Sequence, residues 1–140
     1  MKAVLVIRHR LLPAQEEAIK KAQIEIVETI QQIPEPTTPQ FKQFVSELKA
    51  KGVEAILTVA LPPHLLMAIQ QAGFKLLIFK MEAVKTVESE EEAKKLVEEA
   101  PHKRVALPGA LGEKKTFRVV EFKGIYEVKI VVEEKPIVTA

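Results

Sequence analysis

The sequence predicts an α/β fold, namely a Rossmann-like parallel sheet of four to five strands with helices on both faces, plus a C-terminal antiparallel β-hairpin. Three observations lead to this prediction. Short, continuous apolar runs of the kind that form strands buried on both faces recur through residue 107. Segments with helical apolar spacing separate these runs. Such alternation produces parallel strands joined by right-handed crossovers.

The elements of the first half have clear boundary signals. Pro13 suits the first turn of a helix, and Thr38 is a suitable N-cap for a helix that has Pro39 at its first position and ends at Gly52. The proline-rich residues 33–39 form an irregular connection. The apolar runs of this half predict strands over residues 3–7, 24–27 and 53–61.

The second half continues the alternation and then departs from it. A helix begins at Pro62-Pro63 and ends at Gly73, and another begins at Ser89 with a capping box formed by Ser89 and Glu92. We expect strands over residues 74–79 and 104–107. A two-residue turn at Lys123-Gly124 would join residues 116–122 and 125–132 into the hairpin. These boundaries divide the domain into a Rossmann-like core, residues 1–108, and a hairpin extension, residues 109–140.

The composition narrows the class of function. The chain of 140 residues has no cysteine, which excludes disulfides, thiolate metal sites and a cysteine nucleophile and agrees with a cytoplasmic location. A net charge of +2 does not favour bulk DNA binding, and no apolar run approaches the length of a membrane span. We find no metal-ligand spacing and no glycine-rich phosphate loop, and we expect no cofactor. Abundant lysine and glutamate are typical of thermophilic proteins.

The candidate site lies at the carboxyl ends of the strands, where open α/β sheets bind ligands. Arg8, His9 and Arg10 follow the first strand, His64 follows the third, and Lys80 follows the fourth. Two imidazoles with several cations favour a phosphate-bearing ligand. Each residue also has a structural interpretation, because arginines and lysines solubilise strand ends and a histidine in a first helical turn can cap or pack. We interpret His102 as a surface residue at the opposite edge of the sheet.

Two segments resemble signatures of a known family. Residues 6–15 (VIRHRLLPAQ) resemble the start of small CRISPR-associated proteins, in which a strand is followed by Ser-His or Arg-His and a helix beginning near a glutamine. Residues 56–74 (ILTVALPPHLLMAIQQAGF) resemble a second signature, with strand, Leu-Pro-x-His-Leu, helix and glycine. The family contains Rossmann-like relatives of the CARF domain, some of which are ring nucleases that degrade cyclic oligoadenylate in antiviral defence. The resemblance covers about residues 1–80, and the C-terminal helix and hairpin depart from it.

The resemblance implies a function and a set of site residues. It implies metal-independent cleavage of cyclic oligoadenylate, with cyclic tetra-adenylate as the expected ring, by attack of a 2′-hydroxyl on its own 3′-phosphate, in a homodimer built around the ring. Imidazoles are suited to the proton transfers, since they titrate near neutral pH. The expected catalytic residues are His9, His64 and Arg10. The expected ligand-binding residues are Arg8, Thr58, Pro63, Leu65 and Lys80.

Two other functions are compatible with the same residues. A protein of this fold that senses or scaffolds the cyclic nucleotide without cutting it would need the same pocket. Residues 6–9 are also similar to the Arg-His-Gly entry of histidine phosphatases. However, position 10 is Arg instead of Gly, and no second catalytic histidine is evident, which disfavours the phosphatase.

Overall fold

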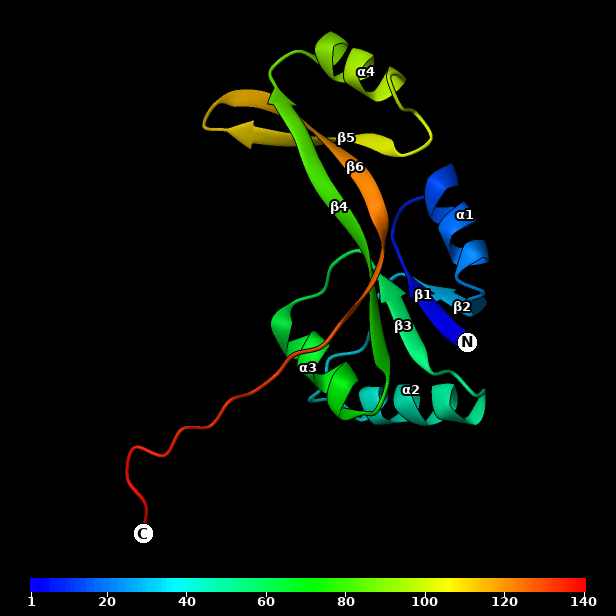
Figure 1. Cartoon of the computed structure of the whole chain (residues 1–140), viewed down its shortest axis with the longest axis vertical. Coiled ribbons are helices and arrows are strands. Elements are labelled where there is room, and N and C mark those ends of the chain that lie inside the picture. Colours follow the sequence, from blue (N-terminus) through cyan, green and yellow to red (C-terminus); the bar gives the residue numbers. More distant parts are fainter.

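A computed structural model describes all 140 residues and shows a mixed, curled six-stranded sheet with four helices (Figure 1). The strand order is β2-β1-β3-β4-β6-β5, in which β2, β1, β3 and β4 are parallel and β6 and β5 are antiparallel additions. The elements in chain order are β1 Lys2–Val6, α1 Pro13–Lys21, β2 Glu25–Ile30, α2 Pro39–Ala50, β3 Ala55–Thr58, α3 Pro63–Gln71, β4 Lys75–Val87, α4 Glu90–Glu98, β5 Arg104–Leu111 and β6 Lys114–Val128.

Helices cover both faces of the parallel part, as the alternation predicted. Alternate residues of β1 and β3 point to opposite faces, because successive side chains of a strand alternate. Val4 and Ile56 pack in the cluster that includes side chains of α2 and α3, whereas Leu5 and Leu57 pack in the cluster that includes Ile19 of α1. Both strands are therefore buried on two sides, which explains their continuous apolar sequences.

The helix starts were predicted well. Proline occupies the first position of α1, α2 and α3, as expected from its fixed backbone angle. Ser89 caps α4, since its Oγ accepts the N–H of Glu92 at 3.4 Å. Thr38 is the N-cap residue of α2, as expected, but its hydroxyl makes no capping bond and instead donates to the carbonyl of Glu35 at 2.7 Å.

The predicted hairpin at Lys123-Gly124 is wrong, because both residues lie inside the single strand β6. Lys80 pairs with Gly124 and Met81 with Phe122, so Lys123 has no partner and forms a bulge. Gly124 has φ +142°, a conformation that side chains with a Cβ rarely adopt. The hairpin turn lies instead at Gly112-Glu113, between β5 and β6, and the boundary predicted at residue 108 falls inside β5.

The antiparallel strands also change the outline of the molecule. β4 extends to Val87, well beyond residue 79 where it was predicted to end, and pairs with β6 along almost its whole length. β4 and β6 therefore project past β1 and β3 and hold β5 and α4 at one end of the molecule (Figure 1). A separate apolar cluster around Val87, Ala93 and Val119 packs α4 there. The fifth strand is present, but it pairs antiparallel with β6.

Candidate functional site

A cleft of about 1300 Å³ lies at the carboxyl ends of β1 and β3. These strands are neighbours in the sheet. However, the chain leaves β1 for α1 on one face and leaves β3 for α3 on the other. This reversal is the switch point at which open α/β sheets bind ligands. The projecting parts of β4, β6 and β5 supply a further wall, with lining residues that include Lys80, Leu107 and Arg118.

Polar side chains at the base of the cleft are buried and held in place. Thr58 is 2% exposed and donates its hydroxyl to the carbonyl of Val6 at 3.1 Å, which ties the ends of β3 and β1 together. Gln15 is also buried, and its Oε1 accepts the N–H of Leu12 at 2.9 Å. That bond fixes the orientation of the amide, whose Nε2 lies 3.7 Å from the sulfur of Met81. These hydrogen bonds therefore fix the orientation of the polar side chains at the bottom of the cleft.

Three unpaired arginines give the cleft a positive charge. The chain has four arginines, and Arg8, Arg10 and Arg118 line the cleft. None of the three takes part in the ion pairs of the structure. The one acidic residue of the lining is Glu35, which pairs with His64. Guanidinium groups without carboxylate partners are suited to phosphate, which they bind in bidentate geometry.

Lys80 lines the cleft but already has partners. Its Nζ lies 3.6 Å from a carboxylate oxygen of Glu82 and 4.9 Å from the ring centroid of Tyr126. The lysine charge is thus partly compensated within the protein. Arg8 and Arg10 are therefore the freer cations at the strand ends.

The structure does not bring the two expected histidines into one lining. His9 lines the cleft and is exposed. His64 is absent from the lining, and its Nε2 lies 3.1 Å from Oε2 of Glu35, which does line the cleft. His64 therefore lies next to the cleft but outside its lining. It is in the first turn of α3, two residues after Pro62.

His102 was predicted to be a surface residue at the opposite edge of the sheet. It is exposed, but it does not lie at that edge. Its carbonyl accepts the N–H of Ala14 at 3.0 Å, which places it beside the start of α1. The prediction failed because it assumed that the fifth strand extends the parallel sheet level with the others. In the structure, β6 carries β5 past the ends of the parallel strands, and Arg104 at the start of β5 pairs with Glu121.

The helix starts near the cleft offer few free N–H groups to an anion. Proline occupies positions 13, 62 and 63 and has no N–H. In α1, Ala14 donates to His102 and Gln15 donates to Leu12. In α3, Leu65 and Leu66 both donate to the carbonyl of Pro62. Side chains, rather than the helix termini that many phosphate sites use, must therefore supply the donors.

Six of the eight predicted site residues line the cleft, and two do not. Lining residues are Arg8, His9, Arg10, Thr58, Leu65 and Lys80, whereas Pro63 and His64 lie outside. Sequence reasoning missed Gln15, Glu35 and Arg118. Gln15 had one signal, a polar residue beside the apolar stripe of the first helix, but Arg118 had none, since only strand pairing brings it to the cleft.

The fourth arginine, Arg104, is part of a structural network that joins α4 to β5 and β6 outside the cleft. Arg104 donates to Glu121 at 2.9 Å, to Glu99 at 2.9 Å and to the carbonyl of Leu96 at 2.8 Å, which joins α4 to β5 and β6. Hydrogen bonds from Lys123 and Arg104 lower the pKa of the buried Glu121 carboxyl to about 2. The same bond to Glu121 raises the pKa of Lys123.

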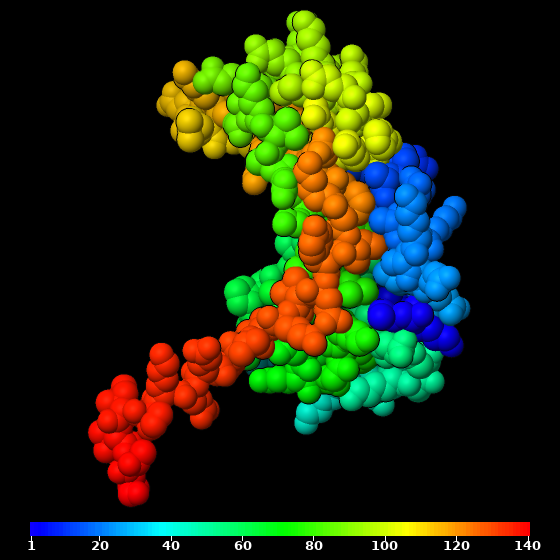
Figure 2. Space-filling model, viewed as in Figure 1, coloured from blue at the N-terminus to red at the C-terminus, as the bar shows by residue number.

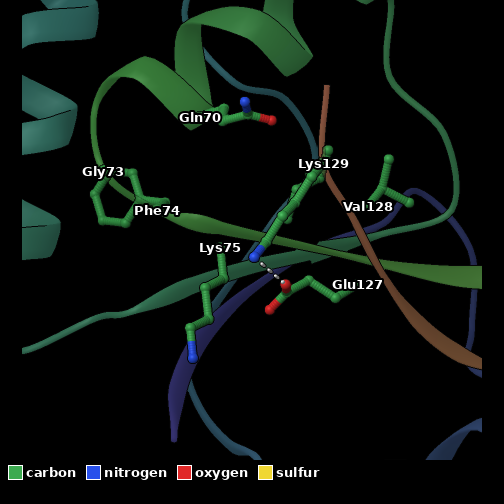
Figure 3. A pocket seen from close by; sticks show the side chains of 8 residues that line it. Gln70, Gly73, Phe74, Lys75, Glu127, Val128 and Lys129 are labelled. Atoms are coloured by element: carbon green, nitrogen blue, oxygen red, sulfur yellow. Dashed lines mark ion pairs between the residues drawn. The ribbon is translucent and has the colours of Figure 1, made fainter. Parts of the chain in front are cut away.

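A second, smaller pocket of about 290 Å³ lies at the other end of the sheet (Figure 3). It lies between the end of α3, the start of β4 and the end of β6. Lys129 points toward Glu127 and pairs with it at 3.4 Å. Lys75, which also lines the pocket, takes part in no ion pair, so the small pocket has one uncompensated cation, compared with the three arginines of the larger cleft.

The fold and the cleft define the chain as an α/β protein with a cationic cleft at the switch point of its sheet. Comparisons with protein-family models, with curated proteins and with solved structures find no match to the chain. No helix is long and apolar enough to cross a membrane. No group of three or more histidine, aspartate or glutamate residues is placed to hold a metal ion.

Proposed function

We propose that the cleft binds a ligand with more than one phosphate group and that this ligand is a nucleotide. The observation that carries the proposal is the pair of unpaired guanidinium groups of Arg8 and Arg10, which flank His9 at the switch point. The apolar part of the lining is suited to bases, since ligand sites are mostly apolar with a few polar groups that fix orientation.

The size of the cleft favours an oligonucleotide over a mononucleotide. Pockets for small ligands have volumes of roughly 300–1000 Å³. The cleft exceeds that range at about 1300 Å³. The resemblance described above implies cyclic oligoadenylate, and we propose cyclic tetra-adenylate as the ligand, bound by a cytoplasmic homodimer with a role in CRISPR antiviral defence.

The proposed reaction is cleavage of the ring without a metal ion. The 2′-oxygen of one adenylate attacks the adjacent 3′-phosphorus, and the bond from that phosphorus to the next 5′-oxygen breaks. The products are a 2′,3′-cyclic phosphate and a 5′-hydroxyl. Neutral His9 accepts the proton of the 2′-hydroxyl, and water protonates the leaving 5′-oxygen. Arg10 stabilises the charge that develops on the phosphate, while Arg8 holds a neighbouring phosphate.

The position of His64 favours a second candidate, a sensor that binds the ring without cutting it. His9 is the one imidazole in the lining, because His64 pairs with Glu35 outside it. General acid–base catalysis of this cleavage is most effective with two groups, one for each proton. A cleft with a single imidazole retains the means to bind phosphate, but it has less means to move both protons.

One incubation separates the two candidates. Purified protein is mixed with labelled cyclic tetra-adenylate in EDTA, and both binding and product are measured. Linear product supports the nuclease, and tight binding of intact ligand supports the sensor. Absence of both binding and product would refute the proposal.

A histidine pair tests the site itself. We expect His9→Ala to lower the cleavage rate about 100-fold or more, since general acid–base groups contribute about 10²–10⁴-fold. His102→Ala is the matched control, because His102 is exposed and outside the lining. Equal rates for the two variants would show that His9 has no role in the reaction.

A further inference from the structure

The last ten residues expose large apolar side chains that nothing in the chain covers. Ile137, Val138 and Val131 are 97%, 87% and 80% exposed, the highest values among the large hydrophobic residues. The segment, residues 131–140, extends away from the body of the molecule (Figure 2). Its start is fixed, because Ile130 exchanges two hydrogen bonds of 2.7 Å with the side-chain amide of Gln70. We call residues 131–140 the tail.

One face of the β5–β6 hairpin is exposed toward its tip, at Leu107 and Leu111, whereas Val120 on the same face is buried. Leu107 pairs with Arg118 and Val105 with Val120, and residues opposite each other in antiparallel strands share a face. The other face carries Ala106 and packs in the cluster of α4. We call the face with Val105, Leu107, Arg118 and Val120 the upper wall of the cleft. Leu107 is 41% exposed there, and Leu111, farther along the same face, is 74% exposed.

The tail and the upper wall are complementary in character. The upper wall has exposed apolar side chains around an arginine without a carboxylate partner. The tail has two apolar pairs, Val131-Val132 and Ile137-Val138, on either side of Glu133, Glu134, Lys135 and Pro136, a stretch with a net charge of −1. Neither glutamate takes part in an ion pair of the structure. Contact between the surfaces would bury apolar area and pair the acidic residues with Arg118.

The tail of the same chain cannot make this contact. Glu133 lies three residues beyond Ile130 and reaches roughly 10 Å from it. Arg118 lies twelve residues before Ile130, and the extended strand between them covers roughly 40 Å. The start of the tail and the upper wall are therefore at opposite ends of β6. The glutamates can meet Arg118 only on another molecule.

We infer that the tail of one copy packs on the upper wall of a second copy and that two copies exchange tails in a two-fold dimer. Val131, Val132, Ile137 and Val138 cover the apolar part of the wall, and Glu133 and Glu134 lie beside Arg118. The tail takes up the part of the cleft along the upper wall and leaves Arg8, His9 and Arg10 open at the other side, so the volume left for a ligand is smaller than that of the separate chain. The inference does not rest on the identity of the ligand.

Sedimentation equilibrium of full-length variants tests the exchange. The wild-type chain is expected to dimerise, and the double variant Ile137→Glu/Val138→Glu and the single variant Leu107→Glu are each expected to raise the dimer dissociation constant about 30-fold or more, the effect of losing an interface hot spot. Val27→Glu is the matched control, since Val27 is 36% exposed on β2, outside both surfaces. The tail variants cannot fail to fold, because the tail makes no core contact.

A charge exchange tests the predicted pairing directly. Arg118→Glu should weaken the dimer, and combining it with Glu133→Arg/Glu134→Arg in the same chain should restore it. Because the chain has no cysteine, a Leu107→Cys copy mixed with an Ile137→Cys copy should form one disulfide between the two molecules under oxidation. A wild-type chain that stays monomeric, a dimer that tolerates the tail variants, or a charge exchange without restoration would each overturn the inference.

Discussion

The salt dependence of ligand binding gives the sharpest test of the cleft. If Arg8 and Arg10 of both protomers each neutralise one phosphate of the ring, four counterions are released when the dimer binds it. Each phosphate contact to a single strand contributes about −0.7 to the slope of log affinity against log salt. The expected slope for the dimer is therefore about −2.8, so that a tenfold rise in salt weakens binding about 600-fold. Titration of labelled cyclic tetra-adenylate by fluorescence anisotropy at several salt concentrations measures this slope.

Single substitutions then show which arginines contribute to the salt slope. Arg8→Gln or Arg10→Gln should each reduce the slope to about −1.4, since each protomer loses one phosphate contact. Arg118→Gln is the informative control, because Arg118 lines the same cleft but, in the dimer inferred above, pairs with the tail of the partner and not with the ligand. A slope near zero for the wild-type chain, or an equal reduction by Arg118→Gln, would refute the assignment of phosphate binding to Arg8 and Arg10.

Three further predictions concern stability and are checked by chemical denaturation followed by circular dichroism. Because the pKa of Glu121 is about 2 in the fold and 4.5 ordinarily, its contribution to the free energy of unfolding is complete above pH 4.5 and lost as the pH falls toward 2. Glu121→Gln should therefore destabilise the protein at pH 7 but not near pH 2. Phe79→Ala should cost about 3–5 kcal/mol, because Phe79 is 1% exposed and packs edge-to-face on Phe122. Gly124→Ala should cost about 1 kcal/mol or more at the bulge, and an unchanged midpoint would contradict the strain at φ +142°.

The parallel half of the fold was predictable because its signals are local. A proline at a helix start and a continuous apolar run need only neighbouring residues to be recognised, and they placed α1, α2, α3 and the strands between them. The antiparallel half depends on pairing between distant segments. Residues 81–87 are mostly polar or small and carry no strong strand signal, yet pairing with β6 keeps them extended. The dipeptide Lys123-Gly124 is a turn signal in the sequence, but in the structure the pairing of β6 with β4 makes it a bulge.

The residues of the candidate site were likewise predictable only where local sequence determines their position. Residues that directly follow β1, such as Arg8 and His9, were placed correctly because the carboxyl ends of parallel strands share an edge. His64 was expected inside the cleft, but it lies outside the lining, where it pairs with Glu35. The sequence gives no sign of this pairing. Arg118 was missed, because its place beside the cleft depends on how β6 pairs with β4 and β5.

The short helix α3 connects two regions that otherwise lie apart. Leu65, near its start, lines the cleft. The side-chain amide of Gln70, near its end, donates to the carbonyl of Ile130 and accepts the N–H of the same residue. The two residues are five positions apart, or about 7.5 Å along the helix axis. Displacement of α3 by a ligand in the cleft would be transmitted to Ile130 through these two hydrogen bonds, and in the proposed dimer it would shift the start of the exchanged tail.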